Sequence, residues 1–153
     1  MTATETWRFV DCGAVDAFEN NAQMAVLARS TSDAGTPILQ TSVWGRTHLN
    51  VGWFDDVDST LDLAECERLG IQVIRRPFAG GGTAFYDAGC AAMFGLMIPK
   101  PADPDAGVDL DREIARMQPI VLNALARIGL AEVTFQGSAD LRWINDRKLG
   151  GIS

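Results

Sequence analysis

Short apolar runs separated by polar turns follow one another along most of this 153-residue chain, and one long segment has the period of a helix. Between residues 111 and 128 apolar side chains recur three or four positions apart, with Gly129 at the end, which predicts the clearest helix. Pro119 inside this segment predicts a kink, because proline removes a helix hydrogen bond. The shorter runs predict strands, over residues 7–10, 38–44, 49–54, 71–74, 91–98, 131–135 and 141–144.

Two further helices are predicted from the residues at their ends. Asp16 is suited to cap a helix that runs to about Ser30. Its apolar positions share one face: Phe18, Ala22, Ala25 and Val26. A short helix over residues 62–69 ends at Gly70, a natural left-handed cap. Strands and helices do not alternate regularly, so the pattern predicts an α+β fold rather than a doubly wound parallel sheet.

Composition and charge narrow the classes of function. The length is that of one ordinary domain, without repeats or a linker between domains. A net charge of −7 argues against binding to nucleic acid or to an anionic membrane surface. No apolar run reaches the roughly 20 residues of a membrane helix, and the N-terminus lacks the features of a signal peptide, so a cytoplasmic location is expected. The three cysteines have no metal-finger or redox spacing, and a single histidine excludes a multi-histidine metal site.

The segment from Arg75 to Asp87 is the most informative for chemistry. Three consecutive glycines, Gly80 to Gly82, are poor in any regular element but suit a backbone that approaches a ligand closely. Arg75 and Arg76, just before them, are cationic donors suited to a phosphate or a carboxylate. A simple glycine turn with two solvated arginines is an equally good interpretation of this loop alone. The glycines match neither the dinucleotide fingerprint nor the phosphate-loop motif.

A second segment, residues 137–153, holds an acidic residue, a short predicted hairpin and then a lysine flanked by glycines. This order predicts that Asp140 and Lys148 lie near each other, with Lys148 in a polar, glycine-flanked turn. Taken alone the segment is weak, because a lysine in such a position is usually solvated.

Together the two segments resemble the lipoate–protein ligase family, which has two arginines before three glycines and, later, a Gly–Asp–Leu region followed by a lysine. The residues of the first motif are Arg75, Arg76, Gly80, Gly81, Gly82, Thr83 and Asp87. Those of the second are Gly137, Asp140, Leu141, Lys148 and Gly150. Weaker matches at Trp7–Gly13, at the helix after it and at Val51–Gly52 keep the same order, so the resemblance spans nearly the whole chain.

The resemblance implies an α+β domain, a mixed sheet with flanking helices, as in biotin and lipoate ligases and related to class II synthetases. It implies that lipoic acid is activated with ATP and Mg²⁺ to lipoyl-AMP and passed to a lysine of a carrier, a lipoyl domain or a glycine-cleavage H protein. The glycine loop and its arginines would bind the adenylate, and Lys148 would be catalytic. Asp140 would orient the nucleotide or hold Mg²⁺.

The chain departs from the family in three places and in length. Tyr86 stands where the family has histidine, Ser138–Ala139 replaces an Arg–Asn pair, and Trp53–Phe54 replaces polar residues. The family continues for about a hundred residues beyond the lysine, whereas this chain ends five residues after Lys148. We therefore expect residues 1–153 to form an incomplete ligase catalytic domain, which a second ligase subunit or an accessory domain would complete.

Two other functions fit the same fold. A lipoyl or octanoyl transferase takes its acyl group from a carrier thioester through a nucleophilic cysteine, which in that group lies in the loop corresponding to residues 137–140, where this chain has none. Cys90, just past the glycine loop, is expected to be a small buried residue. A half-subunit that binds carrier or ligand without turnover is the second alternative. A biotin ligase fits less well, because its arginine-rich loop is absent.

Overall fold

The computed structural model describes residues 6–77, 81–99, 109–137, 139–143 and 145–152. The chain divides into two compact units, residues 1–102 and residues 103–153. Gly80 and most of the proline-rich stretch 99–107 lie outside the described residues. Each unit combines sheet with helix.

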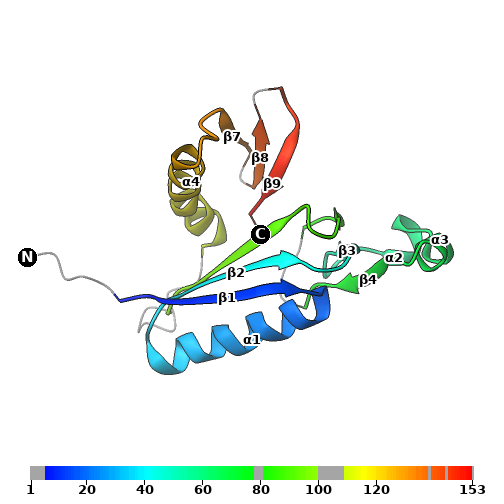
Figure 1. The fold of residues 1–153 in the computed structure, drawn as a ribbon, viewed down its shortest axis with the longest axis horizontal. Helices are drawn as coiled ribbons and strands as arrows, with labels where there is room; N and C mark the ends of the chain where they lie inside the picture. The colour runs from blue at the N-terminus through cyan, green and yellow to red at the C-terminus, as the bar shows by residue number, and fades with distance from the viewer. Residues whose placement is uncertain (1–5, 78–80, 100–108, 138, 144, 153) are drawn as a thin grey trace, which may run out of the picture. The chain divides into compact units, whose positions relative to one another are not determined.

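The first unit contains a mixed sheet covered on one face by a helix (Figure 1). Its strands are β1 (Arg8–Val15), β2 (Ile38–Trp44) and β6 (Ala92–Met97), in the order β1-β2-β6. β1 runs parallel to β2, and β6 runs antiparallel to it. Along β2 every second side chain is buried, from Ile38 to Trp44, and this face contacts the helix α1 (Ala17–Ala34).

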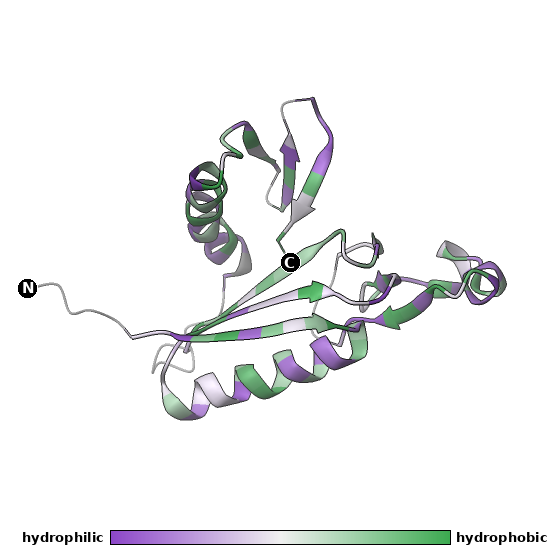
Figure 2. Cartoon of the chain, in the orientation of Figure 1, coloured by the Kyte–Doolittle hydropathy of each residue, from purple (hydrophilic) through white to green (hydrophobic). Residues whose placement is uncertain are grey.

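Helix α1 begins where its sequence predicts but buries a different face. Asp16 caps it by accepting a hydrogen bond from the backbone N–H of Glu19 at 2.8 Å. The predicted apolar face is wrong: Phe18 and Val26 are 57% and 68% exposed, and Ala22 and Ala25 are not buried either. The buried residues are Ala17, Asn20 and Thr31, and in Figure 2 hydrophilic residues interrupt the hydrophobic ones along the visible side of α1.

The reason is a polar cluster between α1 and the sheet. Asn20 Oδ1 accepts hydrogen bonds from Gln40 Nε2 and from Ser42 Oγ, both at 3.4 Å. Its Nδ2 faces the sulfurs of Met24 and Met93, each at 3.4 Å. Asn20, Gln40 and Ser42 are all buried. Because these polar side chains bond to one another, the helix packs through a face that hydrophobic periodicity does not reveal.

A second small sheet in the same unit carries the glycine loop. Its strands are β4 (Gln72–Arg75), β3 (His48–Val51) and β5 (Ala84–Tyr86), in the order β4-β3-β5. β3 is parallel to β4 and antiparallel to β5. The short helices α2 (Val57–Thr60) and α3 (Leu63–Arg68) connect β3 to β4.

The two strands predicted over residues 38–44 and 49–54 both exist, but they belong to different sheets. The second is shorter than predicted: β3 ends at Val51, and the chain turns at once, with the backbone N–H of Asp55 donating to the carbonyl of Gly52 at 3.2 Å. Trp53 and Phe54 are thereby exposed in the turn rather than paired in a strand.

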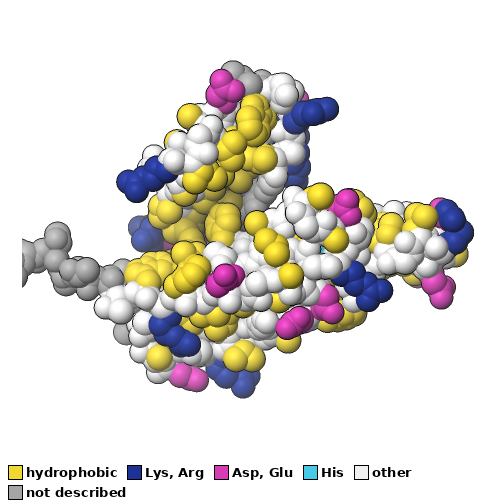
Figure 3. Space-filling view, in the orientation of Figure 1, with side chains coloured by type: hydrophobic (Ala, Val, Ile, Leu, Met, Phe, Trp, Pro, Cys, Tyr) yellow, Lys and Arg dark blue, Asp and Glu magenta, His cyan; other side chains and the backbone are white. Residues whose placement is uncertain are grey.

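The second unit is a helix on a three-stranded antiparallel sheet. Its elements are α4 (Leu110–Arg127), β7 (Val133–Gln136), β8 (Asp140–Trp143) and β9 (Lys148–Gly151), with the strand order β7-β8-β9. Val121, Val133 and Leu141 form its core. Asp109 caps α4, which runs as one helix across Pro119. Figure 3 shows hydrophobic side chains at the surface of this unit, where Ile120 and Ile128 are 53% and 72% exposed.

The architecture is α+β with mixed sheets and flanking helices, as predicted. Three short elements were not predicted: α2, β5 and β9. The last of these corrects the expected position of Lys148, which begins strand β9 instead of lying in a turn. Among the described residues, no helix combines the length and the apolar character that crossing a membrane requires.

Candidate active site

The glycine loop connects β4 to β5 and is described from Gly81 onward. It leaves the sheet beside the end of β3, because the backbone N–H of Arg76 donates to the carbonyl of Val51 at 2.9 Å. Gly81 has a φ of 79°, a left-handed conformation that favours glycine. The loop therefore lies against the turn of residues 52–55, which follows β3.

Both arginines before the glycines bind backbone carbonyls rather than standing free in solvent. Nη1 of Arg75 donates to the carbonyls of Gly52 and Trp53 at 2.9 and 2.7 Å. Nη2 of Arg76 donates to the carbonyl of Gly82 at 2.6 Å. A guanidinium has five N–H donors, so these bonds leave others for a phosphate. Arg75 is exposed and therefore solvated as well as hydrogen-bonded, and the predicted phosphate contact of the two arginines stays a prediction.

The turn contributes two residues that the sequence did not single out for the site. A Cβ built on Gly52 would lie 1.8 Å from the carbonyl oxygen of Gly81, so the backbones of the turn and the loop are in direct contact at this point. Asp55 Oδ2 accepts a hydrogen bond from the Thr83 hydroxyl at 2.9 Å and one from the Gly52 N–H at 3.3 Å. Val51–Gly52 carried only a weak family match, and nothing in the sequence links Asp55 to Thr83, 28 positions away.

Asp87, predicted to bind ligand, closes the turn after β5. Its Oδ1 accepts a hydrogen bond from the Thr47 hydroxyl at 2.6 Å and one from the Ala88 N–H at 3.0 Å. Cys90 follows in the same turn and is exposed, so the expectation that it is buried is wrong.

An aromatic cluster lies beside the loop, where the family has its histidine. Tyr86 pairs with His48 across β5 and β3, and their rings stack with centroids 5.2 Å apart. Trp44 meets His48 edge-on at 4.5 Å. His48 is fully buried, with Nδ1 3.0 Å from the carbonyl oxygen of Arg46. The one imidazole of the chain is thus built into the core beside Tyr86.

The side chains of Lys148 and Asp140 meet diagonally across β8 and β9, as predicted: Lys148 pairs with Arg142, and Asp140 pairs with Gly151. Lys148 Nζ donates to Asp140 Oδ1 at 2.7 Å, and Arg142 Nη2 lies 3.9 Å from Asp140 Oδ2. The hydrogen bond from Lys148, aided by the charges of both cations, holds the pKa of the Asp140 carboxyl below its ordinary value. Lys148 is 57% exposed along its side chain, so its ammonium is open to a ligand.

The glycines of this hairpin have distinct roles. Gly137 has a φ of 65°, which favours glycine before β8. Gly150 pairs with Leu141, and a Cβ there would meet only the Leu141 side chain, at 3.9 Å. A Cβ on the next residue, Gly151, would lie 3.2 Å from the carbonyl oxygen of Ala139. The tighter position is therefore Gly151, which the sequence did not single out; a ligand contact of Gly137 or Gly150 stays a prediction.

Asp140 is also the predicted ligand of Mg²⁺. The described residues include no group of three or more His, Cys, Asp or Glu side chains that could hold a metal ion. Mg²⁺ in nucleotide sites commonly takes one or two carboxylates and completes its shell with phosphate oxygens and water. Asp140 fits that mode but not a metal site made by protein alone. Its role toward the ion stays a prediction.

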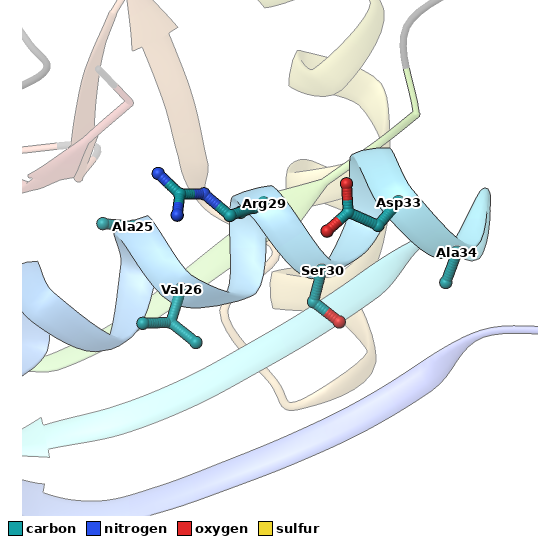
Figure 4. A pocket seen from close by; sticks show the side chains of 6 residues that line it. All are labelled: Ala25, Val26, Arg29, Ser30, Asp33 and Ala34. Atoms are coloured by element: carbon teal, nitrogen blue, oxygen red, sulfur yellow. The ribbon is translucent and has the colours of Figure 1, made fainter.

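A shallow hollow elsewhere in the first unit does not resemble a ligand site. Its lining comes entirely from α1: Ala25, Val26, Arg29, Ser30, Asp33 and Ala34. In Figure 4, Arg29 and Asp33 point to the opposite side of the helix from Val26 and Ser30. Side chains that diverge along one helix do not surround a ligand, so the glycine loop and the Lys148–Asp140 pair are the better candidates.

The two motifs and the α+β fold are shared with a known family of enzyme catalytic domains. Residues 16–153 match the family described as the lipoyl protein ligase A/B catalytic domain, and the chain belongs to this family. The resemblance on which the two motifs were identified is therefore confirmed, over most of the chain.

The curated relatives are octanoyltransferases. LipM of Carboxydothermus hydrogenoformans is 39% identical over 77 residues, which cover 50% of this chain and 29% of the relative. LipM of Geobacillus kaustophilus is 32% identical over 81 residues, covering 52% and 29% respectively. The chain thus matches less than a third of the length of these relatives.

Several solved structures that resemble this chain are lipoate–protein ligases. The bi-partite lipoate protein ligase of Thermoplasma acidophilum has a TM-score of 0.79 at 20% identity, covering 95% of this chain and 54% of that one. LipL1 of P. falciparum, solved with lipoate, gives 0.74 at 20% identity, covering 94% and 42%. Lipoate-protein ligase A bound with ATP gives 0.73 at 19% identity, covering 95% and 59%. At these identities the likeness shows the fold, which is that of the lipoate ligases.

Proposed function

We propose that this chain carries the adenylate-binding part of an ATP-dependent lipoate–protein ligase, which forms lipoyl-AMP and transfers the lipoyl group to a carrier lysine. The observation that carries the proposal is the exposed Lys148 ammonium, held 2.7 Å from Asp140 in a hairpin that contains no cysteine. An ammonium stabilises the negative charge that develops during acyl transfer, whereas a transferase depends on a nucleophilic thiol instead of ATP.

The proposed chemistry has two steps. A lipoate carboxylate oxygen attacks the α-phosphorus of ATP, the bond from that phosphorus to the bridging oxygen breaks, and pyrophosphate leaves. The amine of the carrier lysine then attacks the acyl carbon, AMP leaves with the electrons of the broken C–O bond, and the amine loses a proton. Arg75 and Arg76 would offset phosphate charge beside the glycine loop. Lys148 would contact the anhydride and the carbonyl oxygen.

Asp140 supports this role of Lys148 by fixing the position of its ammonium through the 2.7 Å hydrogen bond. Mg²⁺, where bound, would neutralise charge on the ATP phosphates. Asp140, the carboxylate that pairs with Lys148, would be the protein ligand of this ion. The Thermoplasma acidophilum ligase is bi-partite and was solved as part of a lipoylation system with its E2 lipoyl domain. We propose by analogy that a lipoyl domain or H-type protein is the carrier and that a second subunit or domain completes the enzyme.

An octanoyltransferase is the alternative, and two observations favour it. The curated relatives are octanoyltransferases, and Cys90 is exposed in the turn that follows the glycine loop and β5. In that reaction the thiolate would take the octanoyl group from a carrier thioester without ATP, and a carrier lysine would then displace the thiol. The two functions therefore differ in their need for ATP and for Cys90.

Mass spectrometry of a lipoyl domain decides between them. The protein, with any completing subunit, is incubated either with lipoate, ATP and Mg²⁺ or with octanoyl-carrier thioester alone. A lipoyl mass increase only in the first mixture, with Cys90→Ser within about threefold of the wild type, supports the ligase. Octanoylation without ATP that disappears in Cys90→Ser supports the transferase. No product in either mixture, from a folded protein, supports a non-catalytic subunit and contradicts both enzymes.

A further inference from the structure

The turn after β3 and the glycine loop after β4 are joined through one carboxylate. Asp55 Oδ2 accepts a hydrogen bond from the Thr83 hydroxyl at 2.9 Å and another from the Gly52 N–H at 3.3 Å. The backbone N–H of Asp55 donates back to the Gly52 carbonyl at 3.2 Å, which closes the turn on itself. The carboxylate is thus held by its own turn, with its oxygen directed at the loop.

The same junction is reinforced by contacts that do not involve Asp55. The absence of a side chain at Gly52 lets the carbonyl of Gly81 lie against its Cα. Nη1 of Arg75 donates hydrogen bonds to the carbonyls of Gly52 and Trp53, and Nη2 of Arg76 donates one to the carbonyl of Gly82. Around the described part of the glycine loop, Asp55 supplies the carboxylate, and the other contacts are made by arginines or by backbone.

We propose that Asp55 is a positioning residue of the ligand loop: its bond to Thr83 fixes the backbone of Gly81 and Gly82 in the conformation that receives the acyl-adenylate. The identity of the ligand rests on the proposed function; the junction itself does not. Glycine has the most backbone freedom of any residue, so two adjacent glycines need an external constraint to present their N–H groups in one arrangement.

A consequence follows for Thr83, which the family resemblance assigns to ligand binding. A hydroxyl has one proton to donate, and in this structure that proton points to Asp55. Phosphate oxygens accept hydrogen bonds and offer none. Thr83 therefore serves a phosphate ligand through its backbone and through the loop that it anchors, while its hydroxyl is occupied by Asp55.

Amide hydrogen exchange of the free protein tests the junction without any ligand. Asp55→Ala removes the acceptor, and Thr83→Val removes the donor at nearly constant shape. Each should speed exchange of the Gly81–Thr83 amides about three- to tenfold, the effect of one typical hydrogen bond. The double variant should exchange no faster than the faster single variant, because both remove the same bond. Thr83→Ser and Asp55→Asn each retain a bonding partner and should restore slower exchange.

Asp56→Ala is the matched control. Asp56 is the next carboxylate along the chain, it is exposed, and its side chain makes no cap hydrogen bond at the start of α2. Its replacement should leave loop exchange unchanged. Exchange in β2 is followed in every variant as an internal measure of global stability. Wild-type exchange in Asp55→Ala, additive effects in the double variant or an equal acceleration in β2 would each overturn the proposal.

Binding of a non-hydrolysable lipoyl-AMP analogue separates positioning from a structural role. In Asp55→Ala the Kd should rise about three- to tenfold, or the KM for lipoate should rise similarly with kcat within about twofold. Faster loop exchange with unchanged Kd would overturn the positioning role. If the wild type fails to bind the analogue, the proposed function fails, and the exchange data still decide whether Asp55 orders the loop.

Discussion

The glycine loop and the lysine hairpin, which we define as residues 140–151, hold their charged groups in opposite ways. At the glycine loop both arginines bind backbone carbonyls. In the lysine hairpin the cations Arg142 and Lys148 pair with the carboxylate of Asp140. In the first arrangement the arginines fix the conformation of a backbone that is flexible because it is rich in glycine. The second keeps an ammonium near the surface.

This difference separates two kinds of cation within one chain. A guanidinium is a rigid fork that satisfies several acceptors together, so it suits a structural brace. An ammonium on a flexible stem can follow a charge that develops during a reaction. We therefore expect replacement of Lys148 to affect rate, and replacement of Arg75 to affect the stability of the loop before any rate. Substitutions in the two regions test this contrast.

The largest effect is expected for Lys148→Ala. Loss of one electrostatic contact to a developing charge typically lowers a rate by ~10²–10³. Pyrophosphate exchange on the complete enzyme should fall by about this factor, while the unfolding midpoint stays close to that of the wild type. Lys148→Arg should not restore full activity, because a planar fork cannot reproduce a compact ammonium.

The neighbouring residue provides the control for this measurement. Arg147 is exposed, and in the described chain only its backbone is seen to form hydrogen bonds. Arg147→Ala should exchange pyrophosphate at close to the wild-type rate. Full exchange in Lys148→Ala would reduce that lysine to a solvated surface residue.

The next effect concerns the backbone contact at the glycine loop. Gly52→Ala places a Cβ 1.8 Å from the Gly81 carbonyl oxygen, so one of the two backbones has to move. Overpacking of this kind destabilises by about 1–3 kcal/mol. Gly82→Ala is the control, since a Cβ there meets nothing within 4 Å. Urea unfolding of both variants should separate them, and equal midpoints would mean that the turn and the loop do not touch.

A smaller effect is expected when the arginine brace is removed. Arg75→Met keeps much of the apolar stem but loses the two bonds to the carbonyls of Gly52 and Trp53. We expect about 1 kcal/mol of lost stability, because the group is exposed and the carbonyls can bind water instead. Arg46→Met is the control, at an exposed arginine whose side chain forms no hydrogen bond seen in the described part of the chain. Thermal unfolding measures both variants. If Arg75→Met loses no more stability than Arg46→Met, Arg75 does not brace the turn.

The smallest effect is the pH dependence of the ion pair in the lysine hairpin. The pKa of Asp140 is lowered in the folded chain, mainly by the hydrogen bond from Lys148. The pair therefore contributes stability above the ordinary carboxyl pKa and loses it as pH falls through the lower, folded-state pKa. Carboxyl-carbon NMR should show Asp140 titrating below an ordinary aspartate, and Lys148→Met should raise its pKa. An unchanged titration in that variant would show that the pair does not persist in solution.

The parts of the fold predicted well are those that depend on local pattern. Strand β2 has the bounds that its sequence predicts, and α3 and α4 end near the glycines predicted to end them. The pairing of Asp140 with Lys148 was predicted because a hairpin brings residues eight positions apart together without distant information. Its strand β9 was missed, since lysine and glycine are poor strand formers and the strand depends on pairing with β8.

The parts that could not be predicted depend on which strands become neighbours. Asp55 meets Thr83, and Thr47 meets Asp87, only because β5 pairs antiparallel with β3. No periodicity in a single sequence encodes that choice. The prediction of the buried face of α1 failed for a different reason. The central contact of this face is polar, and apolar side chains of the helix such as Phe18 and Val26 are exposed to solvent.

The polar cluster beneath α1 has a consequence for how uniquely this fold is specified. A hydrophobic interface tolerates small translations of a helix, because one methyl group packs against another almost as well as against the next. The amide nitrogen of Asn20 donates to the sulfurs of Met24 and Met93, and its amide oxygen accepts from Gln40 and Ser42. Met24 belongs to α1 itself, but the other three partners, Gln40, Ser42 and Met93, lie on the sheet, so sliding α1 by one residue would remove all three contacts at once. Replacing Asn20 and Gln40 with leucine and methionine is therefore expected to leave a helix that still adheres to the sheet but no longer selects a single register.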